Sequence, residues 1–213
     1  MKKINWRYAI GELLIVIVGI SIAFALNNWA GKIRDRDEGQ AYLTNIKNDL
    51  SQDIVQLDSN IAKIELRRKY LKELMGHLHV KRPGRDTAAM KIFKVADPVS
   101  FRGNETTIQS MKFSGDLKLI TDIELKNKII AHYSIYEHVG LENERQGTFA
   151  KDYLAEYFMK NIDYSKFRSE DGFDFVEEKY FQNLVYSLYG IYGLGLKVQE
   201  EARQSAKELY EVL

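Results

Sequence analysis

The chain has 213 residues, enough for one domain and a short additional segment. Lys and Arg total 31 against 30 Asp and Glu, so the formal charge of +1 gives no global signature of a nucleic-acid-binding protein. The sequence contains no cysteine, which excludes disulfide frameworks, thiolate metal sites and cysteine nucleophiles. With two prolines and a hydrophobic content of 45%, the composition favours a folded, largely helical protein.

An apolar segment near the N-terminus is long enough to cross a membrane. No residue in the run Leu13–Leu26 is charged. Extended to Tyr8 and Trp29, the run has 22 residues, which cover a hydrocarbon core of ~30 Å at ~1.5 Å per residue. Trp6, Tyr8 and Trp29 stand where interfacial aromatic side chains are usual. The pattern predicts a membrane anchor within residues 1–30.

The fate and the orientation of this segment are separate questions. Ala23-Phe24-Ala25 has the pattern of a signal-peptide cleavage site, but it lies inside an apolar run that is long for a signal peptide, which favours a retained helix. Three cations flank each end, and the α-amino group tips the count toward a cytoplasmic N-terminus. We therefore expect a bacterial inner-membrane protein with its soluble domain in the periplasm. The flanking cations are Lys2, Lys3 and Arg7 before the run, and Lys32, Arg34 and Arg36 after it.

One carboxylate interrupts the predicted membrane helix. Glu12 lies about one turn into the apolar run, where an acidic side chain is costly and is a candidate for helix–helix contacts or a proton path. The alternative is that Glu12 is shallow enough to reach the interface, near Arg7. Small residues four apart also allow close helix packing, although such pairs are common in apolar segments. The pairs are Gly19 with Ala23 and Ser21 with Ala25.

Residues 31–80 have the pattern of one long amphipathic helix. Leu or Ile recurs every seven residues from Leu50, and the positions four residues later carry Ile, Ile, Arg and Met. This heptad spacing gives a narrow apolar seam. The seam fits either the parallel pairing of two chains or packing against later helices of the same chain. The seam residues are Leu50, Ile54, Leu57, Ile61, Ile64 and Leu71.

The end of this helix and the turn after it are basic. Between Arg67 and Arg85 there are seven Lys or Arg and a single acid, Glu73. One interpretation is an anion-binding tip; the more usual one is a solvated face whose cations complement the helix dipole. We expect no nucleic acid as a partner. The candidate anion-binding residues are Arg67, Arg68, Lys72, Arg82 and Arg85.

Residues 81–213 contain several amphipathic patterns, and we expect them to form a helical bundle that packs back on the long helix. A glycine-rich run at 190–195 should loosen or turn the chain before a last helix at 196–213. Fifteen Tyr or Phe lie between Tyr133 and Tyr192. They fit either the core of the bundle or the lining of an apolar pocket for a ligand.

Motifs that carry chemistry are missing from the sequence. His77 and His79 do not share a helix face, and His132 and His138 have no HExxH pattern around them. Acids crowd the start of a helix predicted at 173–192, where the helix dipole explains them without a metal. We expect no enzyme activity, no cofactor and no metal site.

Two stretches of the sequence form longer motifs. The first is Tyr8-Ala9-Ile10-Gly11-Glu12, which is followed by the apolar run and then by Asn27-Asn28-Trp29. The second is Ser114-Gly115-Asp116-Leu117-Lys118-Leu119-Ile120. Both resemble an uncharacterised family of single-pass membrane proteins of Bacteroidetes-type bacteria. The resemblance implies a membrane anchor rather than a signal peptide, and it supplies no catalytic residue.

The sequence thus predicts an all-α protein in three parts: a transmembrane helix at 1–30, a long amphipathic, coiled-coil-like helix at 31–80, and an antiparallel helical bundle at 81–213. The expected function is a membrane-anchored interaction or scaffold protein of the bacterial envelope, oligomeric or a subunit of a membrane complex. The expected partners are the lipid bilayer and either a second copy or another membrane protein. The alternatives are a ligand-sensing bundle and an ion-motor subunit that uses Glu12.

Overall fold

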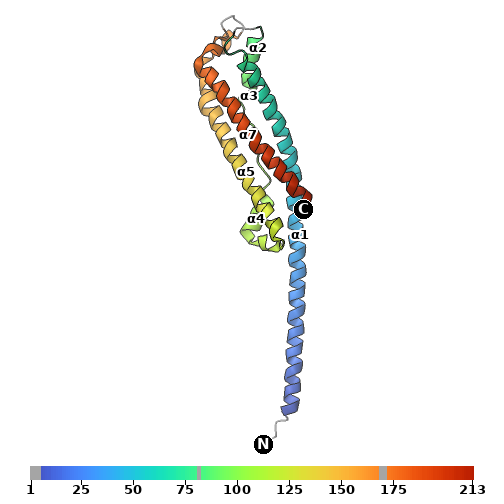
Figure 1. The fold of residues 1–213 in the computed structure, drawn as a ribbon. Coiled ribbons are helices and arrows are strands. Elements are labelled where there is room, and N and C mark those ends of the chain that lie inside the picture. The colour runs from blue at the N-terminus through green and yellow to red at the C-terminus, as the bar shows by residue number, and fades with distance from the viewer. Residues whose placement is uncertain (1–5, 81–82, 168–171) are drawn as a thin grey trace.

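One uninterrupted helix is the longest element of the structure. The computed structural model describes residues 6–80, 83–167 and 172–213, and within them the chain is helical with no strand, which confirms the all-α prediction. The first helix, α1 (Trp6–Met75), has 70 residues and is therefore ~105 Å long at ~1.5 Å per residue. Its N-terminal half stands alone and its C-terminal half packs against the rest of the chain (Figure 1).

Two further rods form a three-helix bundle with the C-terminal half of α1. One is nearly continuous and consists of α5 (Ile123–Phe149), the π-helical segment η2 (Ala150–Ala155) and α6 (Glu156–Asn161). The other is α7 (Lys179–Val212), which lies between α1 and α5 and runs antiparallel to both (Figure 1). The prediction that later helices pack back on the long first helix is confirmed.

Short elements join the rods at the two ends of the bundle. We call the end nearer the apolar half of α1 proximal and the other end distal. The elements α2 and α3 follow α1 at the distal end, and α4 and η1 lie at the proximal end, beside the middle of α1 (Figure 1). The bounds are α2 (Arg85–Met90), α3 (Ile92–Val95), α4 (Thr106–Ser114), η1 (Asp116–Leu119), η3 (Tyr164–Lys166) and η4 (Asp174–Glu177).

The buried side chains form two hydrophobic cores with a polar layer between them. The distal core is rich in aromatic residues, and the proximal core is largely aliphatic. At the level between them α1, α5 and α7 each bury an amide side chain, namely Asn60, Gln146 and Gln199. The distal core includes Ile64, Leu71, Leu74, Leu154, Tyr157, Phe158, Phe173, Phe175, Phe181, Leu188 and Tyr192. The proximal core includes Ile46, Leu50, Leu57, Ile108, Met111, Ile129, Tyr133, Tyr136, Ala202, Ala206 and Leu209.

The prediction that the glycine-rich run breaks the last helix is wrong. The helix α7 continues through Gly190, Gly193 and Gly195 without interruption. A Cβ at Gly195 would meet the amide end of the Gln146 side chain from α5, which would have to shift to make room for it. Gly195 thus leaves room for a side chain of a neighbouring rod, and the helix tolerates the lower propensity of glycine because the bundle supports it.

Candidate functional site

The apolar half of α1 presents its side chains to its surroundings. Almost every residue from 10 to 33 is exposed, including Glu12. Trp29 is also exposed, whereas the side chains of Trp6 and Tyr8 lie outside the described residues. The two pairs of small residues are exposed on the same helix and are open to packing by another helix: Gly19 with Ala23, and Ser21 with Ala25.

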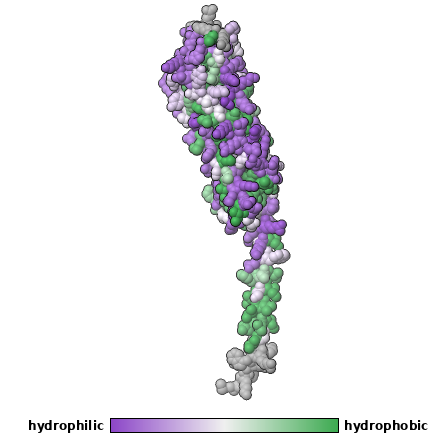
Figure 2. All heavy atoms as spheres, in the orientation of Figure 1, coloured by the Kyte–Doolittle hydropathy of each residue, from purple (hydrophilic) through white to green (hydrophobic). Residues whose placement is uncertain are grey.

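This half of α1 could span a membrane. Among the described helices, α1 is the one that is long and apolar enough to do so, and none of its apolar stretch is buried in the protein. In the space-filling view the stretch is a continuous hydrophobic cylinder below a mixed, largely polar body (Figure 2). A core helix of a soluble protein would instead bury its apolar face against neighbours. Because the stretch lies near the N-terminus, its position fits the hydrophobic part of a signal sequence as well as an N-terminal anchor.

The seam of the long helix lies inside the chain's own bundle. Five of its six residues are buried and Ile54 is half-buried, because α7 and the proximal elements cover them. Of the two arrangements that the heptad pattern allows, the structure therefore has packing against later helices of the same chain. In this structure the seam is therefore occupied by the chain itself and offers no face to a second copy. The seam residues are Leu50, Ile54, Leu57, Ile61, Ile64 and Leu71.

A fully buried carboxylate holds the proximal half together. Asp53 on α1 accepts a hydrogen bond of 2.9 Å from the hydroxyl of Tyr136 on α5. It also accepts bonds from the backbone N–H of Asn104, at 3.0 Å, and from its side-chain amide, at 2.7 Å. Asp53 thus joins α1 to α5 and to the extended segment 97–105. We call Asp53, Asn104 and Tyr136 the proximal clasp.

The electrostatics of the proximal clasp suit structure rather than catalysis. Burial raises the pKa of the Asp53 carboxyl, and the donors from Asn104 and Tyr136 oppose that rise. Burial also raises the pKa of the Tyr136 hydroxyl, so this group remains a hydrogen-bond donor. A general acid or base must reach a substrate proton, and Asp53 is 0% exposed. The clasp therefore fixes the backbone and does not meet a substrate.

The extended segment 97–105 obtains hydrogen bonds from both sides. Asn60 on α1 donates from Nδ2 to the carbonyl of Ser100, at 2.9 Å. Asn143 on α5 donates from Nδ2 to the carbonyl of Phe101, at 2.6 Å. A segment that belongs to no helix or sheet lacks regular backbone hydrogen bonds, so side chains must pair with its buried backbone N–H and C=O groups. These amides and the proximal clasp thus place the segment between α1 and α5.

A second polar pair joins α5 to α7. Nδ1 of His132 lies 2.9 Å from the hydroxyl oxygen of Ser205, beside a groove that Ile135 and Val212 help to line. Burial lowers the pKa of His132 to about 4, so the imidazole is neutral near pH 7. A serine nucleophile needs a base that a third group orients, together with donors for an oxyanion. The described hydrogen bonds of His132 include none to a carboxylate, although Glu208 and Glu211 line the same groove.

About half of the aromatic residues between Tyr133 and Tyr192 are buried, most of them in the distal core, whereas Phe149 and Tyr153 line a groove on the surface. Phe93 stands at the centre of one group, with ring centroids 4.9 Å from Phe158 and 5.7 Å from Phe167. Tyr157 contacts Phe181 with a centroid distance of 5.8 Å. Such tilted and edge-on pairs fill the distal core. The core interpretation of the aromatic stripe is therefore confirmed for its buried residues.

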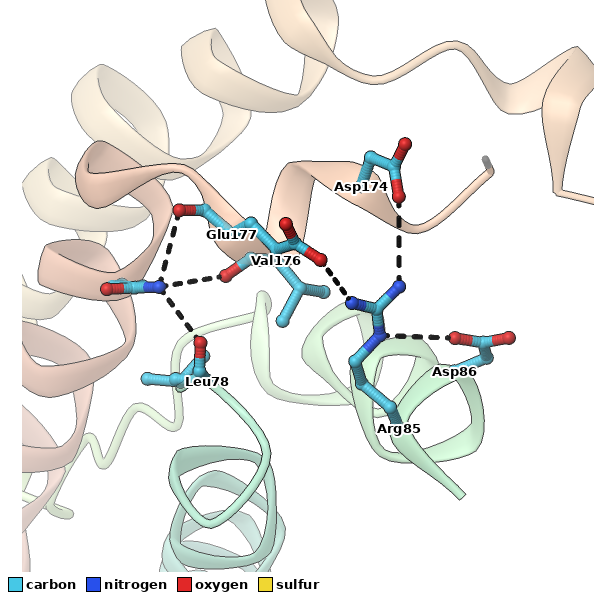
Figure 3. A network of polar contacts seen from close by, with 7 residues as sticks. Leu78, Arg85, Asp86, Asp174, Val176 and Glu177 are labelled. Atoms are coloured by element: carbon cyan, nitrogen blue, oxygen red, sulfur yellow. Dashed lines mark hydrogen bonds and ion pairs between the residues drawn. The ribbon is translucent and has the colours of Figure 1, made fainter. Parts of the chain in front are cut away.

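The distal tip contains an arginine that is neutralised within the protein. Arg85 on α2 is 8% exposed and pairs with Glu177 on η4, at 2.7 Å (Figure 3). Asp174 and Asp86 lie 3.8 Å and 3.6 Å from the same guanidinium. Three carboxylates thus surround one cation, which locks η4 onto α2. Two of the acids that crowd this part of the sequence, Asp174 and Glu177, belong to this ion-pair network, and Glu178 accepts a hydrogen bond from Tyr157.

The other basic residues of the predicted tip do not converge on one site. Arg67 donates to the carbonyl of Asp97 and, at 3.1 Å, to the hydroxyl of Tyr192. The guanidinium of Arg68 stacks on the ring of Tyr189, 4.6 Å from its centroid. Three of the five predicted anion-binding residues, Arg67, Arg68 and Arg85, thus have partners within the protein. Lys72 is exposed, and Arg82 lies outside the described residues.

Sequence reasoning missed a pocket at the proximal end. It lies between α1 and the corner formed by η1 and the start of α5, and it is lined by three cations and several apolar side chains. The cations are Lys32, Arg36 and Lys118. Two of them flank the apolar run in the sequence, but Lys118 is far away in the chain. Only the fold brings the three together.

Comparisons with known proteins give a partial match. Among the residues that the structure describes, no group of three or more His, Asp or Glu side chains is arranged to hold a metal ion. No curated protein and no solved structure matches the chain. A family of unknown function (DUF6090) matches residues 12–82, about one third of the chain, which comprise most of α1 and the turn after it. Over these residues the chain is similar to an uncharacterised family.

Proposed function

We propose that the protein is a membrane-anchored helical interaction module of the bacterial envelope, without catalytic activity of its own. The observation that carries this proposal is the continuity of α1. The same helix has an exposed apolar half of membrane-spanning length and a second half that forms one wall of the bundle. An anchor joined in this way fixes both the height and the orientation of the bundle, which a flexible linker would not do.

The length of α1 supports a display role. Between Trp29 and Met75 the helix rises ~69 Å at ~1.5 Å per residue, so the distal tip stands far from the interface. The packed half of α1 is covered on one side and the bundle is stiffened by the proximal clasp. A partner that touches the distal tip is therefore presented at a defined distance from the membrane.

The outside of the bundle offers apolar contacts to a partner. A groove on α5, η2 and α7 is lined by Leu141, Phe149, Tyr153 and Ile191. Leu141 is 65% exposed and Tyr153 is 50% exposed. Apolar side chains gathered in a groove favour contact with another protein, either a second copy or another membrane protein.

Crosslinking in native membranes tests the interaction role. The full-length protein would carry a photoreactive side chain at Leu141 or, as a control, at the exposed Glu200 on α7. We expect one defined product with Leu141 and none with Glu200, and mass spectrometry would show whether the partner is the same chain or another membrane protein. If neither position gives a product above background, the proposal that this groove binds a partner fails.

The orientation is tested separately. We place the bundle on the periplasmic side of the inner membrane, on the basis of the flanking cations. Because the chain has no cysteine, a Ser59→Cys variant carries a unique thiol on the exposed side of α1. A membrane-impermeant maleimide should label it in intact spheroplasts. Labelling only after lysis would contradict a periplasmic bundle, and loss of the protein from the membrane fraction would contradict the anchor.

A further inference from the structure

The proximal corner of the bundle is held close to the exit point of the apolar run. The carbonyl oxygen of Leu119 in η1 would lie 3.0 Å from a Cβ at Gly39, so the corner touches the backbone of α1 there. Gly39 follows Trp29, where the extended apolar run ends, by ten residues, which is ~15 Å along the helix at ~1.5 Å per residue. The corner is therefore about three helical turns above the apolar run, at the end of the bundle nearer to that run (Figure 1).

Polar contacts fix this corner to α1. The hydroxyl of Tyr42 donates to Asp116 at 3.1 Å, and the hydroxyl of Ser114 donates to the same carboxylate at 2.5 Å. The bond from Ser114 is the main reason that the pKa of Asp116 is lowered, so this group is an anion near pH 7. Gly115, which joins α4 to η1, adopts a φ of +79°, a conformation that glycine tolerates best. The corner is thus a defined turn.

The pocket between this corner and α1 combines cations with an apolar floor. Its volume is about 630 Å³, and it is lined by Lys32, Arg36 and Lys118 as well as by apolar side chains. Within the described part of the chain none of these three cations makes a hydrogen bond or an ion pair. The apolar lining consists of Leu43, Leu119, Ile120 and Leu125.

The acids of the pocket do not cancel its positive charge. Asp122 is the N-cap of α5 and accepts a hydrogen bond from the backbone N–H of Leu125, at 3.0 Å. Asp35 is the other acid of the lining. Three cations against two acids leave the lining with an excess of one positive charge, although the Asp116 carboxylate lies near Lys118 just outside the lining.

The Lys32 end of the pocket lies at the level of lipid headgroups. Lys32 follows the predicted interface residue Trp29 by three residues, which is ~4.5 Å along the helix at ~1.5 Å per residue. The headgroup region extends roughly 5–7 Å beyond the hydrocarbon core on each side. Lys and Arg side chains are long enough to reach further into it. Of the three cations, Lys32 therefore lies at the level of the phosphate groups, and Arg36 lies ~6 Å further along the helix at ~1.5 Å per residue.

Exposed apolar side chains on the same corner point to contact with the bilayer. Phe113, near the end of α4, is 89% exposed, and Ile123, at the start of α5, is 66% exposed. Neighbouring Lys112 is also exposed. Aromatic and aliphatic side chains beside cations are the usual composition of a protein surface that rests on a membrane.

We propose that the proximal pocket binds the phosphate-bearing headgroup of an anionic phospholipid, and that Lys32, Arg36 and Lys118 are its recognition residues. The apolar floor receives the glycerol and the upper acyl segment of the same lipid. Bound lipid fastens the proximal corner to the membrane surface and sets the tilt of the bundle. This inference rests on the proposed membrane anchor.

The test compares nanodiscs that contain the full-length protein. One set is made of phosphatidylcholine alone, and the other contains phosphatidylglycerol as a minor component. We expect phosphatidylglycerol to be enriched in lipid that remains bound on native mass spectrometry, and amide exchange over residues 116–125 to slow only in the second set. In the triple variant Lys32→Gln/Arg36→Gln/Lys118→Gln, each lost cation should lower the enrichment about fivefold.

A matched triple variant controls for net charge. Lys63→Gln/Lys151→Gln/Lys197→Gln removes three exposed lysines from the distal two thirds of the bundle and should leave the enrichment unchanged. Equal enrichment in both triple variants would overturn the proposal. Slower exchange on adding inorganic phosphate to the phosphatidylcholine nanodiscs would overturn it as well, because the site would then bind a soluble anion. Failure of the wild-type protein to float with lipid would instead overturn the anchor.

Discussion

The two halves of the bundle are held together by different means. The distal half packs aromatic rings against one another and against aliphatic residues of α1. The proximal half relies on buried polar contacts, above all the proximal clasp and the pair of His132 and Ser205. A layer of buried amides separates the two. The difference teaches that the proximal half depends on buried hydrogen bonds at its centre, whereas the distal half has an aromatic centre and keeps its ion-pair network, around Arg85, at its tip.

The largest effect should follow from a cavity in the distal core. Phe181 is fully buried, and the Phe181→Ala change should lower the free energy of unfolding by about 3–5 kcal/mol, because the lost contacts are not replaced. Met159→Ala, at a side chain 79% exposed, is the control and should cost less than about 0.5 kcal/mol. Urea unfolding of the full chain in detergent would measure both. Equal effects would contradict an aromatic distal core.

Removal of the clasp carboxylate should have the next largest effect. Asp53→Ala leaves the N–H groups of Asn104 and the hydroxyl of Tyr136 buried without their acceptor, so we expect a loss of about 3 kcal/mol. Asp58→Ala removes an exposed partner of Arg203 and should cost less than about 1 kcal/mol. Amide exchange should quicken over 97–105 in the first variant alone. Unchanged exchange there would show that the clasp does not hold the segment.

A pH effect of intermediate size should be confined to the proximal half. The pKa of His132 is lowered from its ordinary value to about 4, so protons bind the unfolded chain first as the pH falls. Stability due to this group is present above about pH 6.5 and should fall by about 2 kcal/mol on going to about pH 5.

The matched variants isolate this titration. His132→Leu should remove that part of the pH dependence, whereas replacement of the exposed His138 by Gln should not change it. Thermal unfolding at a series of pH values would measure the difference between the variants. A wild-type pH profile that coincides with that of His132→Leu would show that burial does not depress the pKa of this imidazole.

The smallest effect concerns the layer between the cores. Gln146 and Gln199 are buried, and their side-chain amides make no hydrogen bond within the described part of the chain. Gln146→Leu combined with Gln199→Leu should therefore leave the free energy of unfolding unchanged or raise it by about 1 kcal/mol. Chemical denaturation of the double variant is the measurement. A loss above about 2 kcal/mol would show that the amides are essential to the packing of α5 on α7.

Local patterns anticipated the helices but not every break between them. The heptad spacing of Leu50 and Leu57 reports which face of α1 is buried, because side chains three, four and seven apart lie on one face. The glycine-rich run at 190–195 misled the prediction, since propensity is a weak preference that tertiary packing overrides. Gly195 leaves room for the side chain of Gln146, a contact across 49 residues that no local pattern reveals.

The candidate site also depends on contacts between distant residues, which local sequence patterns do not reveal. A cluster of arginines in the sequence suggested an anion-binding tip, yet Arg85 is enclosed by Asp86, Asp174 and Glu177. Two of these acids are about ninety residues away along the chain, so their pairing could not be read from spacing. The pocket with Lys118 escaped notice for the same reason, because its cations come from distant segments.

The sequence by itself determined the apolar run, the helical class and the buried face of the long helix. Each of these depends on residues within a few turns of one another, whose positions the helical repeat fixes. Only the tertiary structure decided which polar groups are internal partners and which remain available. The carboxylate of Asp53 accepts a hydrogen bond from Tyr136, which is 83 residues further along the chain. Lys32 and Lys118 line the same pocket because the segment around Leu119 packs against α1 at Gly39. Hydrogen bonds and ion pairs require proximity in space, which the fold supplies and the order of residues does not.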